Sequence, residues 1–397
     1  MGAPRRRRGR RPEPIYVYRR RRAVALLALV GFLVAFAGFA VAGGGEEHSP
    51  KEQLRAERAE NPVELTIAAS GDLLIHSPLW NQALANGGGS TYDFAPMLAP
   101  IRPYIARADI ALCHFETPLS EEEPMTYPLF RAPAELAEAV KQTGFDACDT
   151  ASNHSLDQEL SGIADTIDIL DAAQLAHTGS YATPGERERP LILEAEGVKL
   201  GFVAYADYTN GIPLPHEWAL NVAEDETEVE RVIADAKRAR EAGAESVIVN
   251  MHWGEENSSE PDADQQAQAD ALTDSKYVTA VVGQGPHVVQ PIERINEKFV
   301  VYSEGNLISN EDVNCCPAAA QDGVLVLLDL VIDGEGAHVD RVRYVPVWVD
   351  HSDYSVLPVG DALRNGEGDA ASLRDSYERT TSVLGEGDGV EPVPPGI

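Results

Sequence analysis

Cysteine is scarce in this 397-residue sequence, and the spacing of the few cysteines excludes one common kind of metal site. The four cysteines are Cys113, Cys148, Cys315 and Cys316. No two of them are separated by two residues, so the sequence has none of the Cys-x-x-Cys pairs that build thiolate zinc sites. No cysteine directly follows the apolar run near the N-terminus, which argues against a lipid-anchored lipoprotein.

Positive charge is also scarce beyond the first 22 residues. The chain has 32 lysines and arginines against 64 acids, and ten of the arginines lie within residues 1–22. The remaining residues carry 22 bases against 63 acids, a net charge of −41. A surface this acidic repels nucleic acid, and no stretch of it alternates basic and aromatic residues. We therefore expect no nucleic-acid partner, and we interpret the acidity as that of a well-solvated exported protein.

One long apolar run is present, at residues 23–42, directly after the basic residues 1–22. Its 20 residues carry no charge, and as a helix they would span about 30 Å, the thickness of membrane hydrocarbon. Because the arginines precede the run, the N-terminus is expected in the cytoplasm and the bulk of the chain outside the cell membrane. The alternative is a cleaved signal peptide, since Ala40-Val41-Ala42 suits a signal peptidase, but the run is long for that role. We expect a single-pass transmembrane anchor; cleavage would instead give a secreted protein.

An exported chain can form disulfides, and four cysteines allow three pairings. Cys113 and Cys148 each lie in an apolar run, which favours two buried, small hydrophobic side chains. Cys315 and Cys316 are neighbours, and a disulfide between adjacent residues is strained. The sequence leaves the state of both pairs open.

Strand and helix patterns alternate through residues 61–385, which indicates one mixed α/β domain. Residues 43–60 are polar and predict a stalk, and residues 386–397 are rich in Gly, Pro and acid and predict a disordered tail. Buried strands are predicted at residues 63–70, 109–116, 145–152, 246–253, 277–283 and 298–304. Helices are predicted at residues 132–144, 160–174, 225–243 and 262–274, and hairpins at 189–207 and 323–349.

Polar side chains follow five of the six predicted strands, at the point where each strand ends. They are Asp72 and His76; His114 and Glu116; Asn153, His154 and Asp157; His252 and Glu255; and His287. In open α/β sheets ligands bind at the carboxyl ends of the strands. Carboxylates, imidazoles and one amide converging there predict a site for divalent metal ions such as Mn, Fe or Zn.

Each of these residues also has an ordinary structural interpretation. A lone histidine at a strand end is more often a satisfied polar group than a ligand, and Glu116 could lie on the surface. Asp72 or Asn153 could form a turn, and Asp157 could cap the helix that begins near Leu160. Five such coincidences at five strand ends are much less probable than one, so the metal site is the favoured prediction.

Six stretches follow one another in a recognisable order. They are GDLLIH (71–76), HFETPLS (114–120), FRAPAELAEAVKQTGFDACDTASNHSLD (130–157), NMHWGEE (250–256), GQGPHVVQPIE (283–293) and YSEGNLI (302–308). In amino-acid sequence and in their order along the chain they resemble the CapA family of capsule or poly-γ-glutamate synthesis proteins, over about residues 60–310. The resemblance implies the calcineurin-like, metallo-dependent phosphatase type of fold, a four-layer α/β/β/α sandwich with a metal cluster between strand ends.

The resemblance also implies roles for individual residues. One or two divalent metals would be held by Asp72, His76, Glu116, Asn153, His252 and His287, with Glu116 as the bridging carboxylate. His154 would be the general acid or a phosphate-contacting residue, and Asp157 would stabilise it. These donors fit a site that activates water and polarises a scissile bond.

Three positions depart from the family pattern. His114 stands where asparagine is usual, Gly285 where the first histidine of a His-x-His pair is usual, and Glu304 where a neutral apolar residue is usual. His114 or Gln284 could replace the missing imidazole; without a replacement, a one-metal or weakly catalytic site is the alternative.

Two functions compete at this point; a third class, a sugar- or peptide-binding ectodomain without metal, leaves the polar strand ends unexplained. The first is a membrane-anchored, metal-dependent hydrolase or transferase that acts outside the cell on phosphoester or amide bonds of an envelope polymer. The second is a non-catalytic component of a polymer synthesis and export complex that keeps the fold with a degraded site. Poly-γ-glutamate is a polyanion, which a domain of charge −41 repels unless metal ions or a local basic patch form the contact surface.

Overall fold

The computed structural model describes residues 50–395, with side chains described from Gln53 onward. Nearly all of the described residues belong to one compact unit, Leu54–Ile397. The predicted basic segment, the predicted membrane helix and the start of the predicted stalk therefore lie outside the described residues. Within residues 50–395, no helix is both long enough and apolar enough to cross a membrane.

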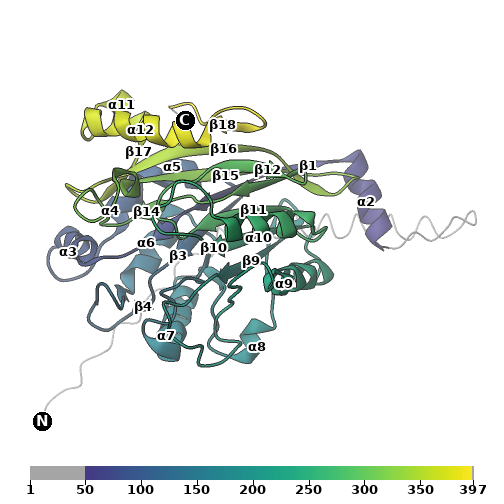
Figure 1. Ribbon diagram of the computed structural model, residues 1–397, viewed down its shortest axis with the longest axis horizontal. Coiled ribbons are helices and arrows are strands. Elements are labelled where there is room, and N and C mark those ends of the chain that lie inside the picture. Colours follow the sequence, from purple (N-terminus) through teal and green to yellow (C-terminus); the bar gives the residue numbers. More distant parts are fainter. Residues whose placement is uncertain (1–49, 396–397) are drawn as a thin grey trace, which may run out of the picture. The chain divides into compact units, whose positions relative to one another are not determined.

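A ten-stranded sheet dominates the Leu54–Ile397 unit (Figure 1). Its strands run in the order β14-β2-β3-β1-β15-β16-β17, while β6 and β7 extend from β3, and β18 pairs with β16. Their bounds are β1 Val63–Ser70, β2 Asp72–Leu73, β3 Ile110–Phe115, β6 Ala147–Asp149, β7 Ala176–Thr178, β14 Asn306–Ile308, β15 Asp322–Ile332, β16 Ala337–Asp350, β17 Ser355–Pro358 and β18 Val390–Pro392.

A six-stranded sheet, in the order β12-β13-β11-β10-β9-β8, forms the second sheet. Its bounds are β8 Leu191–Ala195, β9 Val198–Ala206, β10 Ser246–His252, β11 Ala280–Gln284, β12 Ile292–Ile295 and β13 Lys298–Val301, and a separate pair joins β4 Leu119–Ser120 to β5 Ala132–Pro133. Strands β9, β10, β11 and β13 are parallel, so their carboxyl ends share one edge. The β8–β9 hairpin turns through Glu196 and Gly197, both with positive φ, as a two-residue turn requires.

Alternating side chains show that the two sheets pack face to face. Ile67 of β1 and Ile248 of β10 belong to one buried cluster that draws on both sheets. Their neighbours Ala68 and Val249 point the other way, into two outer clusters. Because successive strand residues face opposite sides, the middle cluster is the core between the sheets.

Helices cover the outer faces and complete four layers. Helices α3, α4 and α6 pack on the large sheet, and α9 and α10 pack on the small one. The helix bounds are α2 Pro50–Glu60, α3 Ser77–Asn86, α4 Ala95–Leu98, α5 Arg102–Ile105, α6 Glu135–Thr143, α7 Glu159–Ala172, α8 Pro184–Arg187, α9 Val229–Glu241, α10 Ala263–Asp274, α11 Val359–Asn365 and α12 Ala370–Leu384. The mixed α/β prediction is confirmed, and the layers follow the α/β/β/α order that the resemblance implied.

The predicted elements are present, with shifted ends. The strand predicted at residues 63–70 is β1, whereas the one predicted at 277–283 begins only at Ala280. Helix α6 ends where Gly144 adopts φ 118°, and α10 begins at a capping box in which Asp262 and Gln265 bond each other's backbone N–H groups.

One question that the sequence left open is answered, and one expectation was wrong. Cys113 and Cys148 are buried, as expected, and they form a disulfide, because β3 and β6 place them directly opposite each other. The tail, expected to be disordered, contributes β18, in which Val390 pairs with Val342 of β16. Within the described residues, Cys315 and Cys316 are free thiols.

Candidate metal centre

The strand ends of the two sheets bring four of the six predicted ligands together, namely Asp72, Glu116, His252 and His287. Asp72 of β2 lies opposite His114 of β3, and Glu116 follows directly after β3. In the other sheet, His252 at the end of β10 lies opposite Gln284 at the end of β11, and His287 lies in the loop that follows. Parallel strand ends at facing edges thus create a buried polar centre, as the sequence pattern predicts.

One group of three ligand-type residues consists of Asp72, Glu116 and His287, all buried. Oδ2 of Asp72 lies 3.3 Å from Nδ1 of His287, and Oε1 of Glu116 lies 3.6 Å from Nε2 of the same ring. Their ligand atoms lie within 4.8 Å of one another, close enough to share one cation.

A second group consists of Asp72, His114 and His252, also all buried. Oδ1 of Asp72 lies 3.6 Å from Nε2 of His114 and 3.8 Å from Nδ1 of His252, while the two ring nitrogens lie 3.0 Å apart. Asp72, and not Glu116 as the resemblance implied, is the residue common to both groups, with one oxygen toward each.

Several buried polar atoms of this centre have no hydrogen-bond partner within the described part of the chain. They are Oδ1 of Asp72, both carboxylate oxygens of Glu116 and Nε2 of His252. Buried polar atoms are normally hydrogen-bonded, so a cluster of unpaired acceptors indicates a missing partner. Carboxylate and imidazole donors suit Mn, Fe or Zn, and the residues therefore fit the predicted divalent metals.

The electrostatics of the centre agree with this fit. Burial raises the pKa of Glu116 to about 7, and burial together with the neighbouring His114 holds the pKa of His252 well below its usual value. Burial opposes the charged form of His114, but the carboxylates of Asp149 and Asp72 outweigh it and raise the pKa of His114 to about 9. Protons thus offset the charge of buried carboxylates, and metal ions would take their place.

Asn153 is buried but uses its amide nitrogen for other contacts. Its Nδ2 donates to the hydroxyl of Tyr208 at 2.8 Å and to Oδ1 of Asn210 at 3.3 Å. Neither contact is the local turn considered above. They fix the amide plane and leave Oδ1 free to accept, which is the atom that a metal would use.

His154 and Asp157 form a close pair beside the cluster. Nδ1 of His154 lies 2.7 Å from Oδ2 of Asp157, and the same carboxylate oxygen accepts from the backbone N–H of Phe130. Asp157 does not cap α7, whose N-cap residue is Gln158 without a side-chain cap. Burial alone would lower the pKa of His154, but the bond to Asp157 and the charge of Glu116 raise it.

His76 belongs to neither of the two ligand groups. It is the N-cap residue of α3, and its Nδ1 accepts a long 3.5 Å bond from the backbone N–H of Asn310. Burial and the nearby His287 lower the pKa of His76 to about 4. Its assignment as a metal ligand stays a prediction. Glu255, the other polar strand-end residue, is also absent from both groups.

Two residues outside the predicted ligand set support the centre. Asp149, at the end of β6, accepts from His114 at 2.7 Å, and Nδ2 of Asn250 donates to its other oxygen at 2.9 Å. Sequence could have indicated Asp149, since it is a charged residue inside the buried strand predicted at residues 145–152, but nothing marked Asn250 within its apolar run.

The positions that depart from the family pattern lie close to one another. Gly285 adopts φ 108°, and its N–H donates to Oδ2 of Asp72 at 3.4 Å. Gln284 donates to Oε2 of the fully buried Glu304 at 2.8 Å. Burial raises the pKa of Glu304 to about 8.

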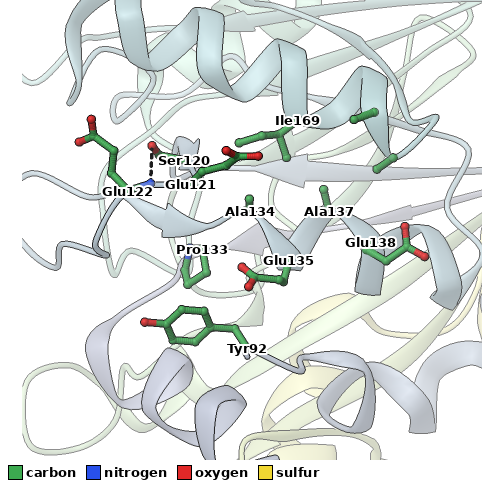
Figure 2. A pocket seen from close by; sticks show the side chains of 12 residues that line it. Tyr92, Ser120, Glu121, Glu122, Pro133, Ala134, Glu135, Ala137, Glu138 and Ile169 are labelled. Atoms are coloured by element: carbon green, nitrogen blue, oxygen red, sulfur yellow. Dashed lines mark hydrogen bonds between the residues drawn. The ribbon is translucent and has the colours of Figure 1, made fainter. Parts of the chain in front are cut away.

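A separate groove of about 550 Å³ lies between α6, α7 and the β4–β5 pair (Figure 2). Apolar side chains such as Ile169 and Ala137 line it, and the carboxylates of Glu122, Glu135 and Glu138 stand around it. None of the ligand-type residues described above lines this groove. Its acidic rim does not suit an anionic polymer.

Comparison with known proteins places the chain in a family. Residues 66–311 match the family described as "Bacterial capsule synthesis protein PGA_cap". The chain is 26% identical over 254 residues to the capsule biosynthesis protein CapA of Bacillus anthracis, which is 62% of this chain and 60% of that protein. It is 22% identical over 304 residues to the PGA biosynthesis protein CapA of Bacillus subtilis (strain 168), which is 75% of each. The match thus spans less than two thirds of the first relative.

Solved structures give more distant similarities. A structure described as a novel phosphatase from Mycoplasma pneumoniae is 14% identical with a TM-score of 0.43, covering 80% of this chain and 99% of that one. A 5'-nucleotidase precursor from Thermus thermophilus is 13% identical with a TM-score of 0.44, covering 81% and 59%. The calcineurin-like phosphoesterase YfkN from Bacillus subtilis is 13% identical with a TM-score of 0.42, covering 81% and 97%. The family match over most of the folded domain shows that the chain belongs to the bacterial capsule synthesis PGA_cap family, the family of the CapA proteins.

Proposed function

We propose that this protein is a metal-dependent hydrolase or transferase that acts on phosphoester or amide bonds of an envelope polymer. The observation that carries the proposal is the sharing of Asp72 by two buried groups of metal-type ligands. A single carboxylate facing two ligand sets is the arrangement expected of a two-metal site. The degraded-site alternative lacks such support, since the centre keeps at least three candidate ligands for each position.

The residues divide the chemical work as follows. Asp72, Glu116, His252 and His287 would hold the divalent ions, and Asn153 would offer its amide oxygen beside them. Bound divalent ions supply an activated water and stabilise the negative charge that develops at the scissile centre. His154, whose ring is held by Asp157, would donate a proton to the leaving group.

We also propose that the protein is a single-pass membrane protein with its catalytic domain outside the cytoplasm, where it acts with other polymer synthesis or export proteins. The apolar run at residues 23–42 supports the anchor. The buried disulfide between Cys113 and Cys148 supports an oxidising location, because disulfides persist outside the cytoplasm. Membrane fractionation with N-terminal sequencing tests this arrangement: a mature chain that starts near Gly43 would exclude the uncleaved anchor.

The activity is tested on the purified full chain, with metal removed by chelation and Mn²⁺ then restored. We expect hydrolysis of a generic phosphodiester or of an envelope polymer fragment to require the restored metal. His154→Ala should lower kcat by about 100-fold or more, the usual contribution of a general acid. His338→Ala is the matched control, because His338 is exposed on β16. A folded chain that binds no metal and hydrolyses neither substrate class would favour the non-catalytic alternative.

A further inference from the structure

His114 is oriented in the way that a metal-ligating histidine is. Its Nδ1 lies 2.7 Å from Oδ1 of Asp149, and an ionised carboxylate only accepts, so Nδ1 carries the proton. When the ring is neutral, its Nε2 therefore presents a lone pair. That lone pair faces Oδ1 of Asp72 at 3.6 Å and Nδ1 of His252 at 3.0 Å.

The size of this triangle matches a coordination sphere. Metal–nitrogen bonds of about 2.1 Å in tetrahedral geometry place neighbouring ligand atoms about 3.4 Å apart. The three separations here are 3.0, 3.6 and 3.8 Å. Oδ1 of Asp72, which faces this space, has no hydrogen-bond partner among the described residues.

Asp149 is in turn held in place from two sides. Nδ2 of Asn250 donates to its second oxygen at 2.9 Å. One residue earlier in the same register, the Cys113–Cys148 disulfide joins the two strands that carry His114 and Asp149. A carboxylate that fixes the tautomer and direction of a histidine is a regular companion of metal-binding rings.

Residue 285 offers no side chain to this position. Gly285 has φ 108°, and a Cβ atom there would lie 3.1 Å from backbone atoms of Trp253 and 3.3 Å from Nε2 of His252. The loop as folded therefore cannot supply an imidazole from residue 285. The other sequence candidate, Gln284, uses its amide nitrogen to bond Glu304.

We propose that His114, held by Asp149, is the ligand that completes the metal position beside His252, in place of a side chain at residue 285, so that Asp72 bridges two full metal positions. This inference rests on the proposed function for the presence of metal. It goes further in assigning a ligand that comes from β3 rather than from the loop after β11.

The test measures bound Mn²⁺ and its electron paramagnetic resonance spectrum, neither of which depends on turnover. The full chain is purified, stripped with chelator and titrated with Mn²⁺. We expect the wild-type protein to bind about two ions with the spectrum of an exchange-coupled pair. His114→Asn should bind about one ion with the six-line spectrum of an isolated Mn²⁺. Asp149→Asn should keep both positions but weaken one by about 10- to 100-fold. His338→Asn, on the exposed face of β16, should match the wild type.

Each contrary result has a distinct meaning. Two coupled ions in His114→Asn, or only one ion in the wild type, would overturn the assignment of His114 while leaving a metal-dependent function standing. A wild-type chain that binds no Mn²⁺ would overturn the proposed function as well. If His114→Asn does not fold, Asp149→Asn decides, because unchanged affinity at both positions in that variant overturns the inference.

Discussion

Oδ2 of Asp72 lies 3.3 Å from Nδ1 of His287, while Oδ1 of the same carboxylate faces His114 and His252. One side chain therefore serves both candidate metal positions. Asp72→Asn removes the shared negative charge but keeps the shape of the side chain. We expect Mn²⁺ affinity to fall by more than about 100-fold at both positions, since even the loss of a residue that only orients a ligand costs 10- to 100-fold. Metal titration checks this.

The control for that variant is Asp340→Asn, which changes an exposed acid on β16. It should bind metal like the wild type. If Asp72→Asn lost only one ion, Asp72 would not be shared, and the two groups would be separate sites.

The His154–Asp157 pair predicts a pH dependence of activity. The bond to Asp157 raises the pKa of His154 against the effect of burial, so the protonated ring persists to higher pH than in a free histidine. Asp157→Asn removes that support. We expect the basic limb of the kcat/KM profile to move down by about one pH unit or more.

A matched control exists at the surface, where Asp171 contacts His177 at 3.3 Å. Asp171→Asn should leave the profile unchanged. The stability of the folded chain depends on pH in the same direction. A histidine pKa that is raised in the folded state stabilises the fold at low pH, and this stabilisation is lost as pH rises through the raised pKa. An unmoved basic limb in Asp157→Asn would show that His154 is not the proton donor.

The disulfide between Cys113 and Cys148 closes a loop with a sequence separation of 35 residues. Chain-entropy arguments give such a loop a stabilisation of about 4 kcal/mol. We expect the double variant Cys113→Ala/Cys148→Ala to lose about that much in denaturant unfolding, and to bind the His114-side metal more weakly because the His114–Asp149 register loosens. Cys315→Ser/Cys316→Ser should change stability by less than about 0.5 kcal/mol, as both are free thiols outside the core. Equal effects of the two double variants would contradict the role of the buried bond.

Much of the metal centre could be predicted because the ends of buried strands can be recognised in the sequence. A buried apolar run that stops at a polar residue shows where a strand ends, and parallel strands bring their ends to one edge. Asp72, Glu116, His252 and His287 were identified in this way, and the structure brings them together. The direction of each ring is a different matter. His76 and His114 both follow from the same pattern, but tertiary packing turns the ring of His114 into the cluster. His76 instead occupies the N-cap position of α3 without a side-chain cap, and its ring accepts from the backbone N–H of Asn310.

The sequence also does not show which distant segments pair with each other. Cys113 and Cys148 lie in two ordinary apolar runs, and four cysteines allow three connectivities. The register of β3 with β6 decides between them. Likewise, the composition of residues 386–397 predicts disorder, whereas Val390 gains a partner on β16, a long strand elsewhere in the chain.

Any side chain at position 285 is expected to lower the free energy of unfolding, because of the backbone conformation of Gly285 and its close neighbours. Its φ of 108° is nearly the 107° of Gly243, where a Cβ atom would meet only the end of Lys199 at 3.9 Å. Gly243→Ala therefore measures backbone strain alone, about 1–2 kcal/mol. Gly285→Ala adds contacts at 3.1 Å with Trp253 and should cost more, and it should also weaken Mn²⁺ binding through His252. Denaturant unfolding and metal titration check both effects; equal costs would show that the loop relaxes freely.

Because β18 pairs with β16, we expect the C-terminal tail to stabilise the fold without contacting the metal centre. The backbone N–H of Val342 donates to Gly389 and that of Val393 donates to Tyr344, both at 2.8 Å. Val390 and Val393 are buried, and burying a valine contributes about 1.5 kcal/mol or more. Deleting residues 386–397 should therefore cost about 3 kcal/mol in denaturant unfolding.

The two residues directly after β18 offer a pair of point variants that separates the burial of one side chain from the presence of the tail. Val393→Ala removes buried apolar surface, whereas Pro394→Ala changes the exposed residue next to it. We expect a loss of about 1 kcal/mol for Val393→Ala and almost none for Pro394→Ala. Mn²⁺ binding should stay at the wild-type level in both, because neither residue contacts the cluster. A deletion as stable as the full chain would mean that β18 adds nothing to β16, and a deletion that lost metal would mean that the edge of the large sheet supports the centre from a distance.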